Sequence, residues 1–248
     1  MTLVLAHRGA PFAAPENTMP SFEIGARTGV DAIELDVHLS ADGRLVVIHD
    51  PTLDRTTDRT GAVAALSLDA IRAADAGHAH TVDGGASFPF RGRGLRVPTL
   101  VEVLDWLPVN LGIVVEVKAV EATEPTVDLL RRRGVAGRAS VISFVLEAIE
   151  RSRAAAPEIP TGLLLEPGDD FDEGLARATA GGHATLNLDD TALGTDPRPL
   201  VERAGSAGVR VGSYVVDEQE RMRVLAAAGV GAFVTNRPDV AAAAGFGR

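Results

Sequence analysis

The chain has 248 residues, 46% of them hydrophobic, no cysteine and a formal net charge of −10. These values suit one mid-sized globular domain with a large core, and they exclude disulfides and thiolate metal sites. The acidic balance opposes nucleic-acid partners and stable membrane association, and no apolar run approaches the ~20 residues that cross a bilayer. The first strand-like run leaves no room for a signal peptide, so we expect a cytoplasmic protein of undetermined oligomeric state.

In chain order, short β-rich runs alternate with stretches patterned like helices. The predicted strands are 3–6, 31–37, 112–117, 140–144, 162–165, 184–188, 209–213 and 232–234, and the predicted helices are 19–28, 124–133, 146–155, 172–180, 198–207 and 217–228. Eight β units with intervening helices favour an α/β fold of the (β/α)₈, or TIM barrel, type over an open doubly wound sheet. No Gly-rich dinucleotide motif follows any of these strands, which weakens the open-sheet alternative further.

The interval between the second and third predicted strands is much longer than the others. It is loop-like, with one predicted helix at 68–76. We interpret it as a small cap segment, about 50–98, inserted into a single domain that spans 1–248. An excursion after a barrel strand is expected over the catalytic mouth, where the βα loops gather.

Acidic side chains stand on two of the predicted strands. Because side chains alternate along a strand, Glu34 and Asp36 share one face, and Glu116 shares a face with Lys118 on the next barrel strand. With the apolar faces against the helices, three carboxylates enter one barrel lumen. An ion pair between Lys118 and Glu116 would neutralise only one of them. A divalent cation with oxygen ligands, Mg²⁺ or Ca²⁺, is therefore the favoured explanation.

Two histidines are expected at the same end of the barrel. His7 ends the first strand, and His49 follows a hairpin with an Asp42-Gly43 turn. A two-residue turn would pair His49 with Asp36, and a four-residue loop would pair it with Glu34. Two imidazoles beside a cation suit general acid–base catalysis, although the sequence does not assign acid and base. The remaining histidines are placed on strand exteriors or in loops and receive no role: His38, His78, His80 and His183.

Two basic side chains are candidates for phosphate binding. Arg8 follows His7 at the mouth, and the fork of a guanidinium matches phosphate oxygens. Lys118 is the only lysine among 24 basic residues, which indicates a position that needs a compact ammonium group. Together with a metal ion, they would form a local cationic site for a phosphodiester anion within an acidic protein.

An ordered set of motifs resembles the glycerophosphodiester phosphodiesterase family. The set comprises His7-Arg8-Gly9, Pro15-Glu16-Asn17-Thr18, Glu34-Leu35-Asp36-Val37, His49-Asp50, Pro98-Thr99-Leu100 and Glu116-Val117-Lys118. The likeness extends over nearly the whole chain and is densest in its first half. No single tripeptide is specific, whereas the ordered set is.

The resemblance implies a barrel with a segment inserted after the second strand. It implies metal-dependent hydrolysis of a small glycerophosphodiester to an alcohol and glycerol 3-phosphate. The roles that it implies are acid–base catalysis for His7 and His49, metal binding for Glu34, Asp36 and Glu116, phosphate contact for Arg8 and Lys118, and support of the site for Glu16 and Asn17. The alternative for Glu16 and Asn17 is a cap at the start of the following helix.

The second half departs from the family pattern at two places. Family members often carry Trp-Thr-Val-Asn near the seventh strand, where this chain has Ser213-Tyr214-Val215-Val216, and Thr-Asp-Arg-Pro near the end, where it has Thr235-Asn236-Arg237-Pro238. The first departure removes a ring and an amide from the expected glycerol side of the pocket. Tyr214 either replaces the ring in part or packs outward, so the reaction class is better defined than the substrate.

Two competing hypotheses are kept. The first is the same chemistry on a lipid, as in a lysophospholipase D or a sphingomyelinase-D-like phosphodiesterase, with Phe88-Pro89-Phe90 lining an acyl groove. The alternative for these aromatic residues is packing of the cap onto the barrel. The second is a non-catalytic phosphoester-binding relative. The retention of both histidines, the three carboxylates and the lysine argues against it.

Overall fold

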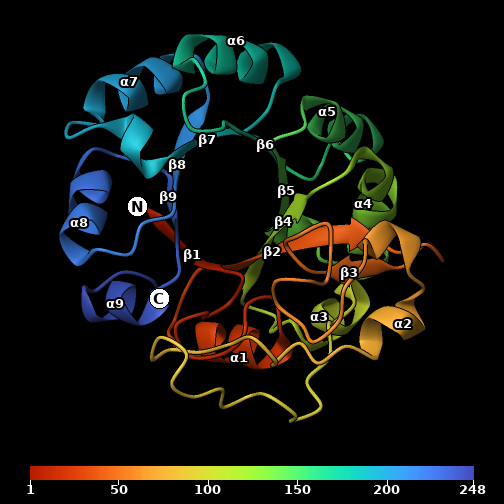
Figure 1. The fold of residues 1–248 in the computed structure, drawn as a ribbon. Coiled ribbons are helices and arrows are strands. Elements are labelled where there is room, and N and C mark those ends of the chain that lie inside the picture. The colour runs from red at the N-terminus through yellow and green to blue at the C-terminus, as the bar shows by residue number, and fades with distance from the viewer.

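Eight parallel strands close into a barrel in the computed structural model, which describes residues 1–248. The barrel strands are β1 (Leu3–His7), β2 (Ala32–Leu39), β4 (Gly112–Val117), β5 (Ala139–Ser143), β6 (Thr161–Leu164), β7 (Thr185–Asp189), β8 (Arg210–Tyr214) and β9 (Ala232–Thr235). They follow one another around the ring in chain order, and β1 pairs with both β2 and β9 (Figure 1). The predicted (β/α)₈ architecture is confirmed.

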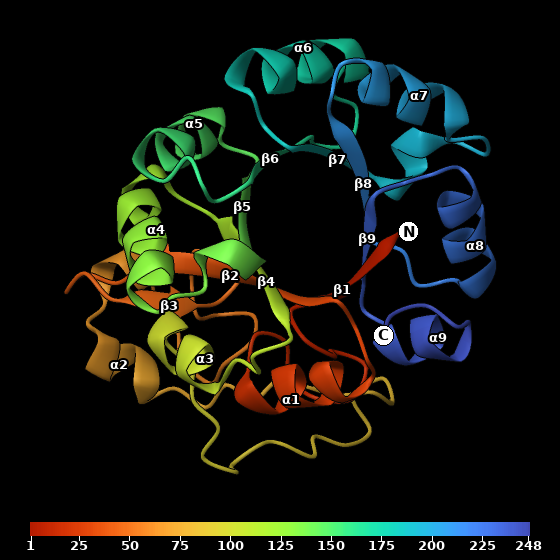
Figure 2. The same cartoon turned by 180° about the vertical axis from the view of Figure 1, so that it is seen from behind.

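Helices surround the barrel on its outer side, as Figures 1 and 2 show from the two ends. They are α1 (Met19–Arg27), α2 (Leu68–Arg72), α3 (Leu100–Trp106), α4 (Thr123–Arg132), α5 (Leu146–Ala155), α6 (Phe171–Gly181), α7 (Arg198–Ser206), α8 (Gln219–Ala227) and α9 (Pro238–Ala243), with short 3₁₀ turns η1 (Val63–Ala65), η2 (Val120–Ala122), η3 (Ala136–Arg138) and η4 (Asp190–Leu193). None of these helices has both the length and the apolar character needed to cross a bilayer.

The alternation of side chains along β2 explains how the barrel positions acidic groups. Ile33, Leu35 and Val37 are fully buried in the apolar layer between the strands and the helices. The intervening residues, Glu34 and Asp36, therefore point into the barrel. Burial of the outward apolar set fixes this orientation, because a shift of one residue would put two carboxylates into the apolar layer.

A short antiparallel strand, β3 (Leu45–Val47), pairs with the end of β2. Neither of the two predicted hairpin registers is correct. Leu39 lies opposite Leu45, and the amide of Ile48 donates to the carbonyl of Asp36. The loop has three residues between Ser40 and Arg44, and it ends on Gly43 at a φ of +72°, a geometry that favours glycine. His49 lies beyond the end of β3, so strand pairing does not place it.

The long segment after β3 has its own small apolar cluster beside the barrel. The helix predicted at 68–76 is present but shorter, since α2 ends at Arg72. In both views the segment flanks β2, α1 and α3 and does not cross the barrel axis (Figure 1). It therefore borders the mouth of the barrel, whereas we expected it to cover the mouth. The buried members of the cluster are Val46, Ile48, Leu53, Val63, Ile71, Ala74, Ala76 and Val97.

The end of this segment is tied back to the barrel at the start of α3. The amide of Val47 donates to the carbonyl of Pro98, and Thr99 forms a capping box with Glu102. The capping box satisfies amide groups that the first turn of the helix leaves unpaired. The Pro98-Thr99 motif therefore has a structural explanation, which is to join β3 to α3.

Candidate active site

Three buried carboxylates meet at the carboxyl-terminal end of neighbouring strands. Glu34 and Asp36 come from β2, and Glu116 comes from β4, where it lies directly beside Asp36 in the strand register. Each offers an oxygen atom, and these oxygens all lie within 4.8 Å of one another. The side chains of Asp36 and Glu116 are 1% and 10% exposed, so water does not solvate their charge. The expected convergence of the three acids is therefore present.

Two basic side chains neutralise part of this cluster. The Lys118 Nζ atom lies 2.6 Å from Glu116 Oε1 and 2.9 Å from Asp36 Oδ1. Lys118 thus contacts two carboxylates, whereas the sequence predicted an ion pair with Glu116 alone. The Arg8 Nε atom lies 3.3 Å from Asp36 Oδ2. Glu34 forms no ion pair and accepts only the backbone amide of Arg8, at 3.1 Å.

The protonation of the three acids follows from these contacts. Burial, with the charges of Asp36 and Glu116 beside it, raises the pKa of Glu34 well above its ordinary value. Burial also raises the pKa of Glu116 to about 7. Although burial opposes its ionisation, Lys118 and Arg8 hold the pKa of Asp36 well below its usual range. The cluster therefore lacks positive charge, and Glu34 is the member with the largest deficit.

The donor set fits a hard divalent cation. Carboxylate oxygens are the ligands that Mg²⁺ and Ca²⁺ prefer, and the site has no cysteine or histidine within the acidic cluster itself. With its histidine neutral and every carboxylate ionised, the surrounding ionic network also lacks two positive charges, the charge of one such ion. Its five carboxylates are Glu16, Glu34, Asp36, Asp50 and Glu116, against three cations, Arg8, Arg55 and Lys118.

Glu16 and Asn17 both contact the site, and neither caps the helix that follows. The N-cap of α1 is Thr18, whose side chain makes no capping hydrogen bond. The Asn17 amide donates to Asp36 Oδ2 at 2.7 Å, and Glu16 lies between Arg8 and Arg55. Arg8 and Asn17 are also the non-glycine residues with positive φ, at 52° and 55°. Such strained backbone is typical of functional sites.

His7 lies at the end of β1 and is held by a residue from the far end of the chain. Its Nδ1 atom lies 2.6 Å from the Oδ1 atom of Asn236, which follows β9. Burial and the neighbouring Arg8 lower the pKa of His7 to about 4. The imidazole is therefore neutral near pH 7.

His49 is held by its chain neighbour. Its Nδ1 atom lies 2.7 Å from Asp50 Oδ1, and Arg55 donates to both oxygens of Asp50. Burial, together with the charges of Arg8 and Lys118, lowers the pKa of His49 below its ordinary value, although Asp36 and Asp50 act in the opposite direction. His38, which was left without a role, contacts the carbonyl oxygen of His49 through Nε2 at 3.0 Å.

Five supporting residues were given no role from the sequence, and they differ in how far the sequence could have predicted their positions. The alternation of side chains along a strand puts His38 on the same face as Asp36, so its position near the site was predictable from the sequence. Asp50 belongs to a quoted motif, but the motif does not state its partner. Arg55 and the carboxylate that holds Asn236, namely Asp217, come from loops whose path no periodicity predicts. Asn236 was noted as a departure, without a contact to His7.

The other histidines lie away from the acidic cluster. His183 contacts Thr161 within the outer wall of the barrel. In the inserted segment, Asp75 accepts backbone amides, and Asp83 accepts from Ser87 and Thr81. Neither carboxylate belongs to a metal-ligand group with His78 or His80.

The aromatic residues of interest lie in two places, the barrel interior and the inserted segment. Tyr214 points inward, where its ring packs edge-on against Phe144 and its hydroxyl donates to the carbonyl of Leu165. It does not pack outward. In the inserted segment, Phe88 lies under Arg91 and Phe90 packs edge-on against a histidine of the same segment. These two phenylalanines make their aromatic contacts within the cap.

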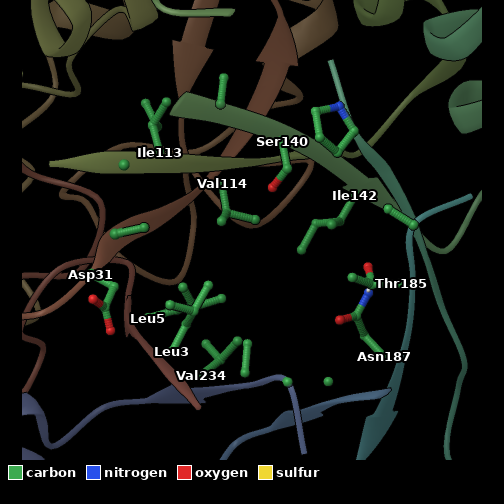
Figure 3. A pocket seen from close by; sticks show the side chains of 18 of the residues that line it. Leu3, Leu5, Asp31, Ile113, Val114, Ser140, Ile142, Thr185, Asn187 and Val234 are labelled. Carbon is green, nitrogen blue, oxygen red and sulfur yellow. Dashed lines mark hydrogen bonds between the residues drawn. The ribbon is translucent and has the colours of Figure 1, made fainter. Parts of the chain in front are cut away.

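A separate cavity of about 430 Å³ occupies the opposite, amino-terminal half of the barrel. Figure 3 shows Leu5, Val114, Ile142 and Val234 pointing into it from four different strands. Tyr214 also lines this cavity, whereas the three acids and both candidate catalytic histidines do not. The active-site assignment therefore rests on the chemistry at the carboxyl ends of the strands and not on this hollow.

Comparisons with known proteins identify the family of this chain. The family model described as the glycerophosphoryl diester phosphodiesterase family matches residues 7–240. A glycerophosphodiester phosphodiesterase of Caldanaerobacter subterraneus is 32% identical over 249 residues, covering 96% of this chain and 95% of the relative.

Solved structures extend the likeness to the fold. The crystal structure of a glycerophosphodiester phosphodiesterase from Agrobacterium tumefaciens has a TM-score of 0.84 and 30% identity, covering 98% of this chain and 100% of the other. An Oleispira antarctica phosphodiesterase, in complex with the product sn-glycerol-3-phosphate, has a TM-score of 0.83 and 25% identity, covering 98% and 96%. This chain belongs to the glycerophosphoryl diester phosphodiesterase family.

Proposed function

We propose that this protein hydrolyses a glycerophosphodiester to an alcohol and glycerol 3-phosphate. The observation that carries the proposal is the placement of two histidines, each with its Nδ1 atom engaged, around a buried triad of carboxylates. Family membership and the glycerol 3-phosphate bound to the Oleispira relative support the substrate class.

In the proposal, Glu34, Asp36 and Glu116 hold one divalent cation, Mg²⁺ or Ca²⁺. Their mutual distances and the two missing positive charges support this assignment. When bound, the cation supplies positive charge that stabilises the negative charge developing on the phosphoryl oxygens.

Arg8 and Lys118 are the proposed phosphate contacts. Both lie against carboxylates but keep free donors: Arg8 donates to Glu16 through Nη1 and places Nε 3.3 Å from Asp36 Oδ2 without a hydrogen bond, which leaves Nη2 without a protein partner. Lys118 donates a hydrogen bond to Glu116 and forms an ion pair with Asp36 at 2.9 Å, so its ammonium keeps free N–H groups. These remaining donors are fixed by the ion pairs and available to phosphate oxygens, so little reorganisation accompanies binding. Glu16 and Asn17 hold Arg8 and Asp36 in these positions.

In the proposal, the hydrogen-bond partner of each histidine determines whether it acts as the general base or the general acid. His7 is held by a neutral amide and is unprotonated near pH 7, so it accepts a proton from the attacking oxygen nucleophile. His49 is held by the carboxylate of Asp50, which acts against the lowering of its pKa by burial, and we assign it the donation of a proton to the departing alcohol oxygen. In each ring, Nε2 is the nitrogen left for the reaction.

The test is an unbiased panel of phosphodiesters assayed with the purified protein in a metal series. We expect turnover of glycerophosphocholine with Mg²⁺ or Ca²⁺, loss of turnover with a chelator, and recovery when the ion is restored. Preferential turnover of a lysophospholipid would replace the substrate assignment. No turnover of any phosphodiester, including a nitrophenyl ester, would refute the proposal in favour of a phosphoester-binding role.

A further inference from the structure

A hydrogen-bonded pair, Asp217 and Asn236, stands behind His7. The Asn236 side-chain amide donates to Asp217 Oδ2 at 3.0 Å, and its backbone amide donates to Asp217 Oδ1 at 2.7 Å. Thr235 Oγ1 donates to the same Oδ1 atom at 3.0 Å. Asp217 follows β8, and Asn236 follows β9, so the pair joins two neighbouring strand ends on the side of the barrel next to β1.

This arrangement determines which way the Asn236 amide faces. An ionised carboxylate only accepts hydrogen bonds, so the NH₂ group of Asn236 must face Asp217. The carbonyl oxygen of the same amide must then face His7, where Oδ1 lies 2.6 Å from Nδ1. The orientation is therefore set by the chemistry of the neighbour.

The amide orientation in turn determines the tautomer of His7. A carbonyl oxygen cannot donate, so the Nδ1 atom of His7 must carry the hydrogen. In a neutral imidazole the lone pair is then on Nε2, the nitrogen not engaged by Asn236. An imidazole that is free to rotate or to exchange tautomers would present an N–H at Nε2 part of the time and could not accept a proton there.

The identities of the two residues depend on each other. An aspartate at position 236 would set a second carboxylate against Oδ2 of Asp217, and two adjacent carboxylates resist ionisation together. An asparagine at 217 would remove the acceptor-only partner and allow the Asn236 amide to turn. The present pair keeps a neutral group against His7 and places the negative charge one residue further away.

We propose that Asp217 and Asn236 form a positioning unit for His7, in which Asp217 orients the amide and the amide holds His7 as the Nδ1–H tautomer. The inference rests on the proposed function for its catalytic consequence. Neither residue touches the reacting atoms. The unit acts by fixing the proton acceptor, so its loss should lower kcat while leaving KM little changed.

The direct test is ¹⁵N NMR of histidine-labelled protein loaded with Mg²⁺, with His7→Asn used to assign the His7 signals. We expect the Nδ1–H tautomer in the wild type. Asn236→Ala should give mixed tautomers and about a 10²-fold loss in kcat, and Asp217→Asn about a 10-fold loss. The double exchange Asp217→Asn with Asn236→Asp again places an acceptor against Nδ1, so it should recover the Nδ1–H tautomer, while kcat should stay low because a carboxylate beside His7 favours the protonated ring. Asp239→Asn is the matched control, because Asp239 pairs with exposed Arg237 and should change nothing.

The outcomes separate this inference from the proposed function. An Nε2–H tautomer in the wild type, or unchanged tautomer and kcat in both single variants, would overturn it. If Asn236→Ala fails to fold, Asp217→Asn, which keeps the side-chain size, gives the same readout. If the wild type turns over no phosphodiester but the tautomer responds as expected, the positioning unit stands and the proposed activity falls.

Discussion

The two sides of the active site hold their histidines by different chemistry. On the β1 and β9 side, His7 meets the neutral amide of Asn236. On the β2 and β3 side, His49 meets the carboxylate of Asp50, which Arg55 holds in place. A carboxylate stabilises an imidazolium and an amide does so only weakly. The difference teaches that one neighbouring residue can give each of two identical side chains a different preference for the proton, and the proposed division into base and acid depends on it.

Removing either imidazole should give the largest effect. We expect His7→Ala and His49→Ala each to lower kcat on glycerophosphocholine by about 10²-fold or more, because each removes a proton-transfer group. The fold should be kept, since both side chains lie at the barrel mouth and outside the apolar core. Steady-state kinetics with circular dichroism checks this, and His78→Ala in the inserted segment is the control. Wild-type kcat in either active-site variant would remove that histidine from the mechanism.

The acidic cluster between the two sides gives the next effect. Glu34→Gln should chiefly weaken metal binding, by about 10-fold or more, because it removes the acid that has no ion pair. Isothermal titration with Mg²⁺ and Ca²⁺ measures it, with exposed Glu121→Gln as the control. An unchanged metal titration would exclude Glu34 from the ligand set.

The same cluster predicts how stability depends on pH. The pKa of Glu116 is raised from 4.5 to about 7 by burial. A raised pKa gives stability that is fully present below 4.5 and is lost as the pH rises through about 7. The metal-free protein should therefore lose stability over this range, and added metal should raise the melting temperature more at pH 8 than at pH 5. Melting curves with and without Ca²⁺ test it, and an equal metal effect at both pH values would contradict it.

Replacing Asp50, the partner of His49, tests whether a carboxylate partner distinguishes His49 from His7. Asp50 raises the pKa of His49, so Asp50→Asn should lower that pKa. If His49 must be protonated, activity falls as the pH rises through its pKa, and this fall should occur at lower pH in the variant. We expect about a 10-fold loss near neutral pH. The profile of kcat/KM against pH measures the shift, and a movement to higher pH would argue against His49 as the acid.

The smallest effect is expected for His38, which supports His49 only through its backbone. His38→Ala removes the contact to the His49 carbonyl and should cost about 1 kcal/mol of stability. Activity should fall only several-fold. Urea unfolding and kinetics check both values. A loss as large as that of His49→Ala would show that His38 has a direct role in the chemistry.

Periodicity made the barrel and its acidic cluster predictable. Helix 146–155 was predicted at its observed bounds, and the alternation along β2 placed Glu34 and Asp36 in the lumen without any structure. Outside the strands and helices, the sequence has no periodic pattern, and the positions of side chains there could not be predicted. His49 lies beyond β3, and its position follows from a three-residue loop that neither expected register described.

The supporting residues were the least predictable part. Asn236 is 229 positions from His7, and only closure of the barrel brings their strands together. Arg55 joins Glu16 to Asp50 from an irregular segment, where no hydrophobic pattern fixes the backbone. The residues that hold a catalytic group come from whichever loops are adjacent in space. A single sequence therefore shows the candidate chemical groups better than the contacts that orient them.

The division of roles between His7 and His49 is tested most directly by comparing a nitrophenyl phosphodiester with glycerophosphocholine in the two alanine variants. A nitrophenolate leaves without protonation, so it does not need a general acid. We expect His49→Ala to regain most of its activity on the nitrophenyl ester, whereas His7→Ala stays impaired on both substrates. Recovery in His7→Ala with none in His49→Ala would contradict the account.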